Sequence, residues 1–195
     1  MLAVCFNCTA RGTSSRSGGF IALTLRWMTD DAISSTEPPI AIPLGDDADT
    51  TRIGAALGRA LARSDVVLLS GGLGAGKTAL ARAAITARLA RVGRTDDIPS
   101  PTFTLVQIYE ADIPIWHADL YRLSVSDEVY ELGLDEAFET AAVFIEWPDR
   151  LGAATPARVL KVELDFGPKG EGRIAVIQPL GPGWAPVMDA LKDAI

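Results

Sequence analysis

The stretch Val66-Val67-Leu68-Leu69-Ser70-Gly71-Gly72-Leu73-Gly74-Ala75-Gly76-Lys77-Thr78 decides the fold. It begins with a continuous apolar run, which is typical of a strand buried on both faces of a parallel sheet. A glycine-rich loop of the pattern Gly-x-x-x-x-Gly-Lys-Thr follows at once and leads into a segment with helical periodicity. A loop of this pattern between a buried strand and a helix is the signature of a P-loop. The stretch therefore predicts an α/β domain that binds a nucleotide.

Each polar feature of the loop has a physical reason. Gly74 and Gly76 allow backbone torsions that turn successive N–H groups inward around a β-phosphate, at the positive end of a helix. Lys77 can bridge the β- and γ-phosphates, and Thr78 can place its hydroxyl on Mg²⁺. ATP with Mg²⁺ is therefore the expected ligand pair.

Two carboxylates follow apolar strand-like runs and are candidates to support the metal. Asp119 follows residues 113–118, and Glu146 follows residues 142–145. A P-loop ATPase needs such a carboxylate at the end of a neighbouring strand. Two other roles remain open, because Asp119 could pair with Arg122 and Glu146 could cap the turn into Pro148. Which carboxylate contacts the metal is also open.

Two aromatic ring systems precede Asp119. His117 lies one residue inside a strand end, where a histidine is more often a hydrogen-bonding core residue than a base, so no chemistry is assigned to it. Trp116 is expected to be a core residue.

Helices alternate with strands along residues 38–195, which predicts one three-layer α/β P-loop domain, its sheet flanked by helices and extended by antiparallel strands in the C-terminal part. The expected strands are 39–44, 66–69, 103–109, 113–118, 142–145, 158–166 and 173–178. The expected helices are 48–63, 77–91, 126–132 with Gly133 as its cap, and one from about 184.

Residues 1–37 lack a sustained helical or strand period and are expected to be a disordered N-terminal extension. An organellar transit peptide and a true start at Met28 are the alternatives. The segment holds both cysteines, Cys5 and Cys8, which lack the further ligands that zinc requires and are interpreted as reduced thiols. The absence of a disulfide framework favours a cytoplasmic protein.

Composition argues against two classes of protein. The chain has 195 residues and a formal charge of −7, and residues 1–29 contain arginine but no acid, so the remainder is more acidic still. An acidic body disfavours direct binding to a nucleic-acid backbone. No apolar run is long enough to cross a bilayer, so no membrane role is expected.

The remaining motifs separate the P-loop classes. The only asparagine is Asn7, so the Asn-Lys-x-Asp loop of Ras-like GTPases is absent. Between Asp119 and Glu146 the only arginine is Arg122, whereas small-molecule kinases usually carry an arginine-rich lid. ATP hydrolysis or nucleotide-dependent switching is therefore favoured over phosphoryl transfer to a metabolite.

Four motifs in order resemble the bacterial tRNA threonylcarbamoyladenosine biosynthesis ATPase family, TsaE or YjeE, over residues 39–180. The motifs are Leu73-Gly74-Ala75-Gly76-Lys77-Thr78, Ser100-Pro101-Thr102-Phe103-Thr104-Leu105, His117-x-Asp119-Leu120-Tyr121-Arg122 and Ile145-Glu146-Trp147-Pro148. The resemblance implies a small Mg²⁺-dependent ATPase needed to modify the adenosine beside the anticodon in tRNAs that read codons beginning with A. Its implied partners are a sugar-kinase-like threonylcarbamoyl transferase and the inactive paralogue of that enzyme, with ATP hydrolysis resetting the complex and tRNA contacted only through it.

The resemblance also implies roles for individual residues. Thr78 and Glu146 would hold Mg²⁺, Asp119 would orient the attacking water or support the metal, and Thr102 would sense the γ-phosphate. Trp147 would stack near the nucleotide or the partner, with Asp149 and Arg173 as weaker candidates for the rim. The phosphates would be held by Lys77 and by the amides of residues 74–79, namely Gly74, Ala75, Gly76, Lys77, Thr78 and Ala79.

This sequence departs from the family pattern in two places. Ala79 stands where many members carry Thr or Ser, and the N-terminal extension is longer than usual. Two other functions remain as alternatives: a small-molecule kinase, and a nucleotide-responsive binding protein that barely hydrolyses ATP.

Overall fold

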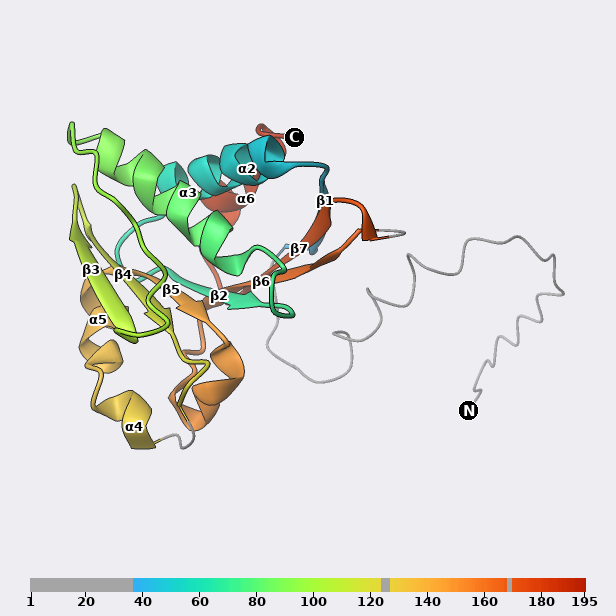
Figure 1. Ribbon diagram of the computed structural model, residues 1–195. Coiled ribbons are helices and arrows are strands. Elements are labelled where there is room, and N and C mark those ends of the chain that lie inside the picture. Colours follow the sequence, from blue (N-terminus) through green and yellow to red (C-terminus); the bar gives the residue numbers. More distant parts are fainter. Residues whose placement is uncertain (1–36, 124–126, 168–169) are drawn as a thin grey trace, which may run out of the picture. The chain divides into compact units, whose positions relative to one another are not determined.

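Seven strands form one mixed β-sheet in the computed structural model, which describes residues 37–123, 127–167 and 170–195 (Figure 1). Their order across the sheet is β1-β7-β6-β2-β5-β4-β3. The strands are β1 (Ile40–Leu44), β2 (Val66–Ser70), β3 (Val106–Glu110), β4 (Pro114–Asp119), β5 (Ala142–Glu146), β6 (Val159–Phe166) and β7 (Arg173–Leu180).

The centre of this sheet is parallel and its two sides are antiparallel. Strand β2 is parallel to both neighbours, β5 and β6, and β4 is parallel to β5. On one side β7 pairs antiparallel with β6 and β1, and on the other side β3 pairs antiparallel with β4. The predicted fold class, with antiparallel additions in the C-terminal part, is confirmed, and β1 and β3 extend the antiparallel pairing to both edges.

Helices cover both faces of the sheet (Figure 1). On one face lie α2 (Asp47–Ala60), α3 (Lys77–Ala90) and α6 (Ala185–Lys192). On the other face lie α4 (Asp127–Tyr130) and α5 (Leu134–Thr140), and two short 3-10 turns follow β5, η1 (Pro148–Arg150) and η2 (Gly152–Ala154).

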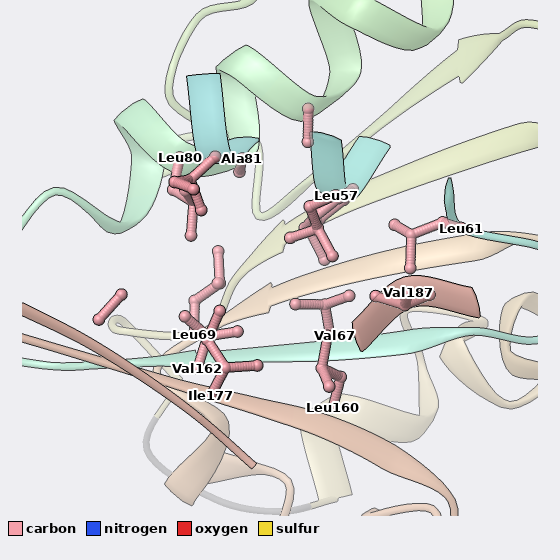
Figure 2. Close-up of a cluster of buried hydrophobic side chains, with 14 of the residues drawn as sticks. Leu57, Leu61, Val67, Leu69, Leu80, Ala81, Leu160, Val162, Ile177 and Val187 are labelled. Carbon is pink, nitrogen blue, oxygen red and sulfur yellow. The ribbon is translucent and has the colours of Figure 1, made fainter. Parts of the chain in front are cut away.

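Strand β2 contributes to the core on both faces, as its unbroken apolar run predicts. Val67 and Leu69 belong to the cluster beneath α2 and α3, whereas Val66 and Leu68 belong to the cluster on the α5 side. Figure 2 shows Val67 and Leu69 pointing toward the helix layer that carries Leu57 and Leu80. Fully burying one such side chain stabilises the fold by about 1.5–3 kcal/mol, so β2 is anchored on both sides before its loop begins.

The segment predicted as one strand over 103–109 contains a turn before the strand. Strand β3 begins only at Val106. Leu105 has a left-handed φ of 63°, and its N–H donates to the Pro101 carbonyl at 2.7 Å. This turn leaves Phe103 exposed and brings Thr102 back toward β4. The prediction was wrong for residues 103–105 because apolar periodicity does not reveal a left-handed turn at a leucine.

Two helical predictions also differ from the structure. Helix α2 ends at Ala60 rather than at residue 63, and Asp65 accepts a hydrogen bond from the N–H of Ala62 just beyond it. Gly133, predicted as a helix cap at the end of 126–132, instead occupies the N-cap position of α5, with φ 70°. Helix α5 was not predicted, although its Leu134 and Ala137 are buried in the core cluster on the α5 side of the sheet, the one that contains Val66 and Leu68.

The predicted N-terminal extension, residues 1–37, falls outside the described residues except for Glu37, as do both cysteines and Met28. Residues 33–195 group as one compact unit. Among the helices of the described ranges, none has the length and apolar character required to cross a bilayer.

Candidate functional site

The loop between β2 and α3 is shaped by close contact with the sheet at one end and by the helix start at the other. A Cβ on Gly71 would lie 2.2 Å from the carbonyl oxygen of Leu164 in β6, so no larger residue fits there. Gly76 has a φ of 106° and is the N-cap of α3, without a side-chain cap on the first amides of the helix. The first N–H groups of a helix have no acceptor within it. The loop therefore presents these donors at the positive end of α3.

Space for an anion lies over this loop. A Cβ built on Gly74 or Gly76 would meet no atom within 4 Å. Open space beside backbone donors at a helix N-terminus is the arrangement that binds phosphate in P-loop proteins. The residues present thus fit a nucleotide phosphate.

Lys77 folds back over the loop. Its Nζ donates to the carbonyls of Gly71 and Gly72 at 2.8 Å each, and lies 4.1 Å from the ring centroid of Trp147. Burial lowers the pKa of this ammonium below its ordinary 10.5, and the charges of Glu146 and Asp119 oppose that shift. Lys77 is therefore a desolvated cation held by carbonyl dipoles and an aromatic face, both of which a phosphate could replace.

The hydroxyl of Thr78 meets the carboxylate of Glu146. Thr78 Oγ1 donates to Glu146 Oε2 at 2.9 Å, and the second carboxylate oxygen, Oε1, lies 2.9 Å from Nε2 of His117. Glu146 is the last residue of β5 and is buried, with its side chain directed at these two partners rather than at the turn into Pro148. The alternative role of a turn cap therefore does not describe its contacts.

Asp119 closes the neighbouring strand β4 and lies opposite Glu146 in the sheet register. Its Oδ2 accepts from Thr102 Oγ1 at 2.7 Å, and its Oδ1 accepts from the N–H of Tyr121 at 3.0 Å. Since Thr102 donates its hydroxyl proton to Asp119, the Ser100 hydroxyl at 2.8 Å must donate to Thr102.

The alternative partner of Asp119, Arg122, lies elsewhere. Its guanidinium is over the ring of Phe103, 5.8 Å from the centroid. The structure thus joins Asp119 to the Ser-Pro-Thr-Phe loop rather than to Arg122.

Trp147 forms an aromatic pair with Tyr121 and lies beside Lys77. Its φ of 59° is left-handed, which is uncommon for a bulky residue, and its ring centroid is 4.9 Å from that of Tyr121. With this torsion, immediately after Glu146, the indole ring lies against the ammonium of Lys77. Trp116, predicted to be a core residue, is partly buried and packs against the core cluster on the α5 side without being one of its buried members.

Arg173 and Asp149, the two rim candidates, differ in placement. Arg173 donates to the carbonyl of Gly74 at 3.1 Å and so contacts the loop, while its guanidinium covers the ring of Phe166. Asp149 is exposed on η1. The structure therefore joins Arg173 to the phosphate loop and leaves Asp149 at the surface.

Ala75 of the loop and Ala79 of α3 have different surroundings. Ala75 is buried in the core, and its N–H donates to the Gly72 carbonyl at 3.2 Å. Ala79, one residue beyond Thr78, lines a hollow of about 520 Å³ between α2 and α3 together with Thr50 and Arg82.

Oxygen donors at one end of the sheet fit Mg²⁺. Thr78 and Glu146 are adjacent, and Asp119 lies beside Glu146. Magnesium prefers such hard donors and takes one or two protein carboxylates together with substrate phosphates and water. Among the described side chains, no group of three or more His, Cys, Asp and Glu could hold a metal without such help. The donor set therefore fits a Mg²⁺ ion brought in with a nucleotide.

Two of these contacts were not predicted from the sequence. His117 was assigned no chemistry, yet it contacts Glu146, and Tyr121 packs on Trp147. One signal for the first contact was available: residues 117 and 119 lie on the same face of a strand, at the strand end where Glu146 was also expected.

Comparison with known proteins gives a consistent result. Residues 44–173 match the family model described as "Threonylcarbamoyl adenosine biosynthesis protein TsaE". A tRNA threonylcarbamoyladenosine biosynthesis protein TsaE from Nostoc sp. is 37% identical over 167 residues, covering 80% of this chain and 93% of the relative. The protein of the same name from Rickettsia conorii is 37% identical over 123 residues, covering 63% of this chain and 69% of the relative.

A solved structure shares the fold. Bacillus subtilis YdiB superposes with a TM-score of 0.67, covering 82% of this chain and 98% of that one. The sequences are 22% identical, so this likeness bears on the fold alone.

Proposed function

The chain belongs to the TsaE family of threonylcarbamoyl adenosine biosynthesis proteins and acts in tRNA threonylcarbamoyladenosine biosynthesis, and from this premise we propose that it is a Mg²⁺-dependent ATPase. The observation that carries the proposal is the contact of Thr78 Oγ1 with Glu146 Oε2 at 2.9 Å, directly beside an open phosphate loop. Hydrolysis yields ADP and phosphate, in the cytoplasm.

The charges around the loop support a requirement for the metal. Two buried carboxylates, Glu146 and Asp119, face one ammonium, Lys77. With Arg173 at Gly74 these charges sum to zero, so the chain has no surplus positive charge to neutralise a polyphosphate. Thr78 and Glu146 would hold a Mg²⁺ ion here, and the ion would supply the positive charge that the nucleotide phosphates require.

The chain's own residues divide the work. The amides of 74–79 and Lys77 hold the phosphates, Arg173 supports the loop through Gly74, and Thr78 and Glu146 are the metal ligands. Asp119 orients the attacking water, and the Thr102 hydroxyl reports on the γ-phosphate through its hydrogen bond to Asp119.

We place the protein partners at the mouth of this site. Three apolar side chains around it are strongly exposed: Leu73 at 82%, Phe103 at 86% and Tyr121 at 52%. The chain has a pI of about 4.7, which favours contact with a protein over direct contact with tRNA. The transferase and its inactive paralogue are the proposed partners, and nucleotide turnover resets their complex.

The test of hydrolysis uses the purified chain alone and with the transferase pair. We expect slow turnover alone and a sharp rise with the pair. Lys77→Ala abolishes ATP binding, and Glu146→Ala lowers hydrolysis by at least about 100-fold while weakening ATP binding less. Lys192→Ala, which removes an exposed lysine of α6, is the matched control and leaves turnover unchanged. Unchanged turnover in Lys77→Ala or Glu146→Ala would contradict the site assignment.

The resetting role has its own readout. With Lys77→Ala in the complex, the first round of tRNA modification proceeds and later rounds stop, whereas the wild-type chain supports many rounds. Equal multiple-turnover rates for the two chains would overturn the resetting role. A phosphorylated metabolite among the products would identify a kinase instead.

A further inference from the structure

His117 is a fully buried polar residue in β4, and packing alone does not require a polar side chain at this position. It is the only histidine in the chain, and its exposed fraction is 0%. Its Nε2 lies 2.9 Å from Oε1 of Glu146 on the adjacent strand β5. A leucine or phenylalanine would fill the same volume without a polar atom to satisfy.

The contact determines the tautomer. An ionised carboxylate only accepts hydrogen bonds, so Nε2 of His117 carries the proton. The other ring nitrogen, Nδ1, is the single buried side-chain polar atom without a partner among the residues that the structure describes. A proton on Nδ1 would be a buried donor left unpaired, so the ring is satisfied only through Glu146.

The two carboxylate oxygens of Glu146 therefore have different hydrogen-bond partners. Oε1 is held by the ring of His117, and Oε2 faces the hydroxyl of Thr78. The imidazole is fixed by the strand and by burial, so it fixes the rotation of the carboxylate. Partners behind a metal-binding carboxylate orient it, and their loss typically weakens metal binding by about 10–100-fold.

We propose that His117 is a positioning residue that holds the Glu146 carboxylate toward Thr78 and so sets the affinity of the site for Mg²⁺. This role rests on the proposed function, because it takes Glu146 as a ligand of the metal. His117 itself contacts neither the metal nor the nucleotide.

A matched pair of variants separates positioning from packing. The side-chain amide of His117→Gln places a donor where Nε2 lies, whereas the shorter side chain of His117→Asn places it near Nδ1, out of reach of Glu146. Both replace the ring by an uncharged amide. We measure the Mg²⁺ concentration at half-maximal ATP hydrolysis and kcat at saturating Mg²⁺.

We expect His117→Asn to raise the half-maximal Mg²⁺ concentration by about 10–100-fold with a smaller change in kcat. His117→Gln should recover most of that loss. ATP binding without Mg²⁺ and thermal unfolding serve as checks that both variants fold. Equal Mg²⁺ dependence in the two folded variants, or an unchanged value in His117→Asn, would overturn the proposal.

A second readout does not depend on hydrolysis. Because the chain has one histidine, ¹⁵N-histidine labelling gives an NMR spectrum of His117 alone. The nucleotide-free chain should show a protonated Nε2 and an unprotonated Nδ1, and Glu146→Ala should shift the Nε2–H resonance. A proton on Nδ1 alone, or no shift, would refute the contact. The expected spectrum in a chain that fails to hydrolyse ATP with its partners would instead refute the proposed function.

Discussion

At the scale of the residue, Lys77 shows how one cation is held before a nucleotide arrives. It is buried and hydrogen-bonded to two loop carbonyls, and it lies over the ring of Trp147. Burial lowers its pKa more than the nearby carboxylates raise it. The folded chain therefore stabilises the charge of Lys77 less than water does. This favours a change of partner, in which the ammonium leaves the loop carbonyls and binds a phosphate.

The lowered pKa of Lys77 predicts a pH dependence of stability. The unfolded chain binds this proton more tightly than the folded chain does, so protonation favours unfolding. Below the pKa that Lys77 has in the folded chain, the loss of stability caused by burying the ammonium is constant. This loss decreases as pH rises from that pKa to 10.5 and is absent at higher pH. Relative to Lys77→Met, the wild-type free energy of unfolding should therefore rise with pH across this window.

Denaturant unfolding of the two nucleotide-free chains from about pH 7 to about pH 11 measures this difference. Subtracting Lys77→Met cancels the groups common to both. A difference that falls with pH would show that the pKa of Lys77 is raised rather than lowered.

At the scale of the element, the helix layer that carries the phosphate loop depends on close contact between α2 and α3. A Cβ on Gly58 would lie 2.1 Å from the Ala84 carbonyl oxygen, and one on Gly54 would lie 2.7 Å from the Ala83 Cβ. Arg88 of α3 donates to three carbonyls at the end of α2, those of Gly58, Arg59 and Leu61. The position of α3, and with it the loop at its N-terminus, is set by this contact.

Gly58→Ala tests the close approach. In an exposed helix this change stabilises by up to about 1 kcal/mol, because alanine is the better helix former. Here the new methyl group meets backbone, so we expect a loss of about 1–3 kcal/mol in the free energy of unfolding. Urea unfolding measures it.

The matched control for this variant is Arg59→Ala, one residue further along α2 with an exposed side chain. It should change the free energy of unfolding by no more than about 0.5 kcal/mol. A stabilised Gly58→Ala would mean that the two helices are not in contact at this point.

At the scale of the whole molecule, one sheet brings the candidate site residues together. Strands β2, β5 and β4 are parallel and in register, with Leu69 opposite Glu146 and Glu146 opposite Asp119. Their carboxyl ends therefore meet at one edge, where the phosphate loop begins. The antiparallel strands on either side widen the sheet, and β7 also delivers Arg173 to Gly74.

We propose that residues 38–195 form a single P-loop ATPase domain that folds without the N-terminal segment. Residues 33–195 already group as one compact unit. A chain that lacks residues 1–37 should keep its free energy of unfolding within about 0.5 kcal/mol and keep its ATP affinity. Calorimetry of both chains measures the two quantities, and a loss of either would assign the segment a part in the domain.

The sequence by itself determined the phosphate loop, the buried strand before it, the helix after it and the α/β class, because these depend on local patterns. Val66–Leu69 is apolar without a break, and Gly71, Gly76, Lys77 and Thr78 are fixed in spacing. The ordered motifs also identified the family. Local patterns were insufficient at Leu105 and Gly133, where a left-handed residue directly precedes β3 and α5.

Only the tertiary structure decided which side chains share a hydrogen bond. Glu146 takes Thr78 and His117 as partners, and Asp119 takes Thr102, across separations of 68, 29 and 17 residues. The order of the strands and their register set these pairs, and both arise from packing of the whole sheet rather than from any segment of it. The sequence therefore predicted the candidate residues, whereas the fold determined how they are arranged around the phosphate loop.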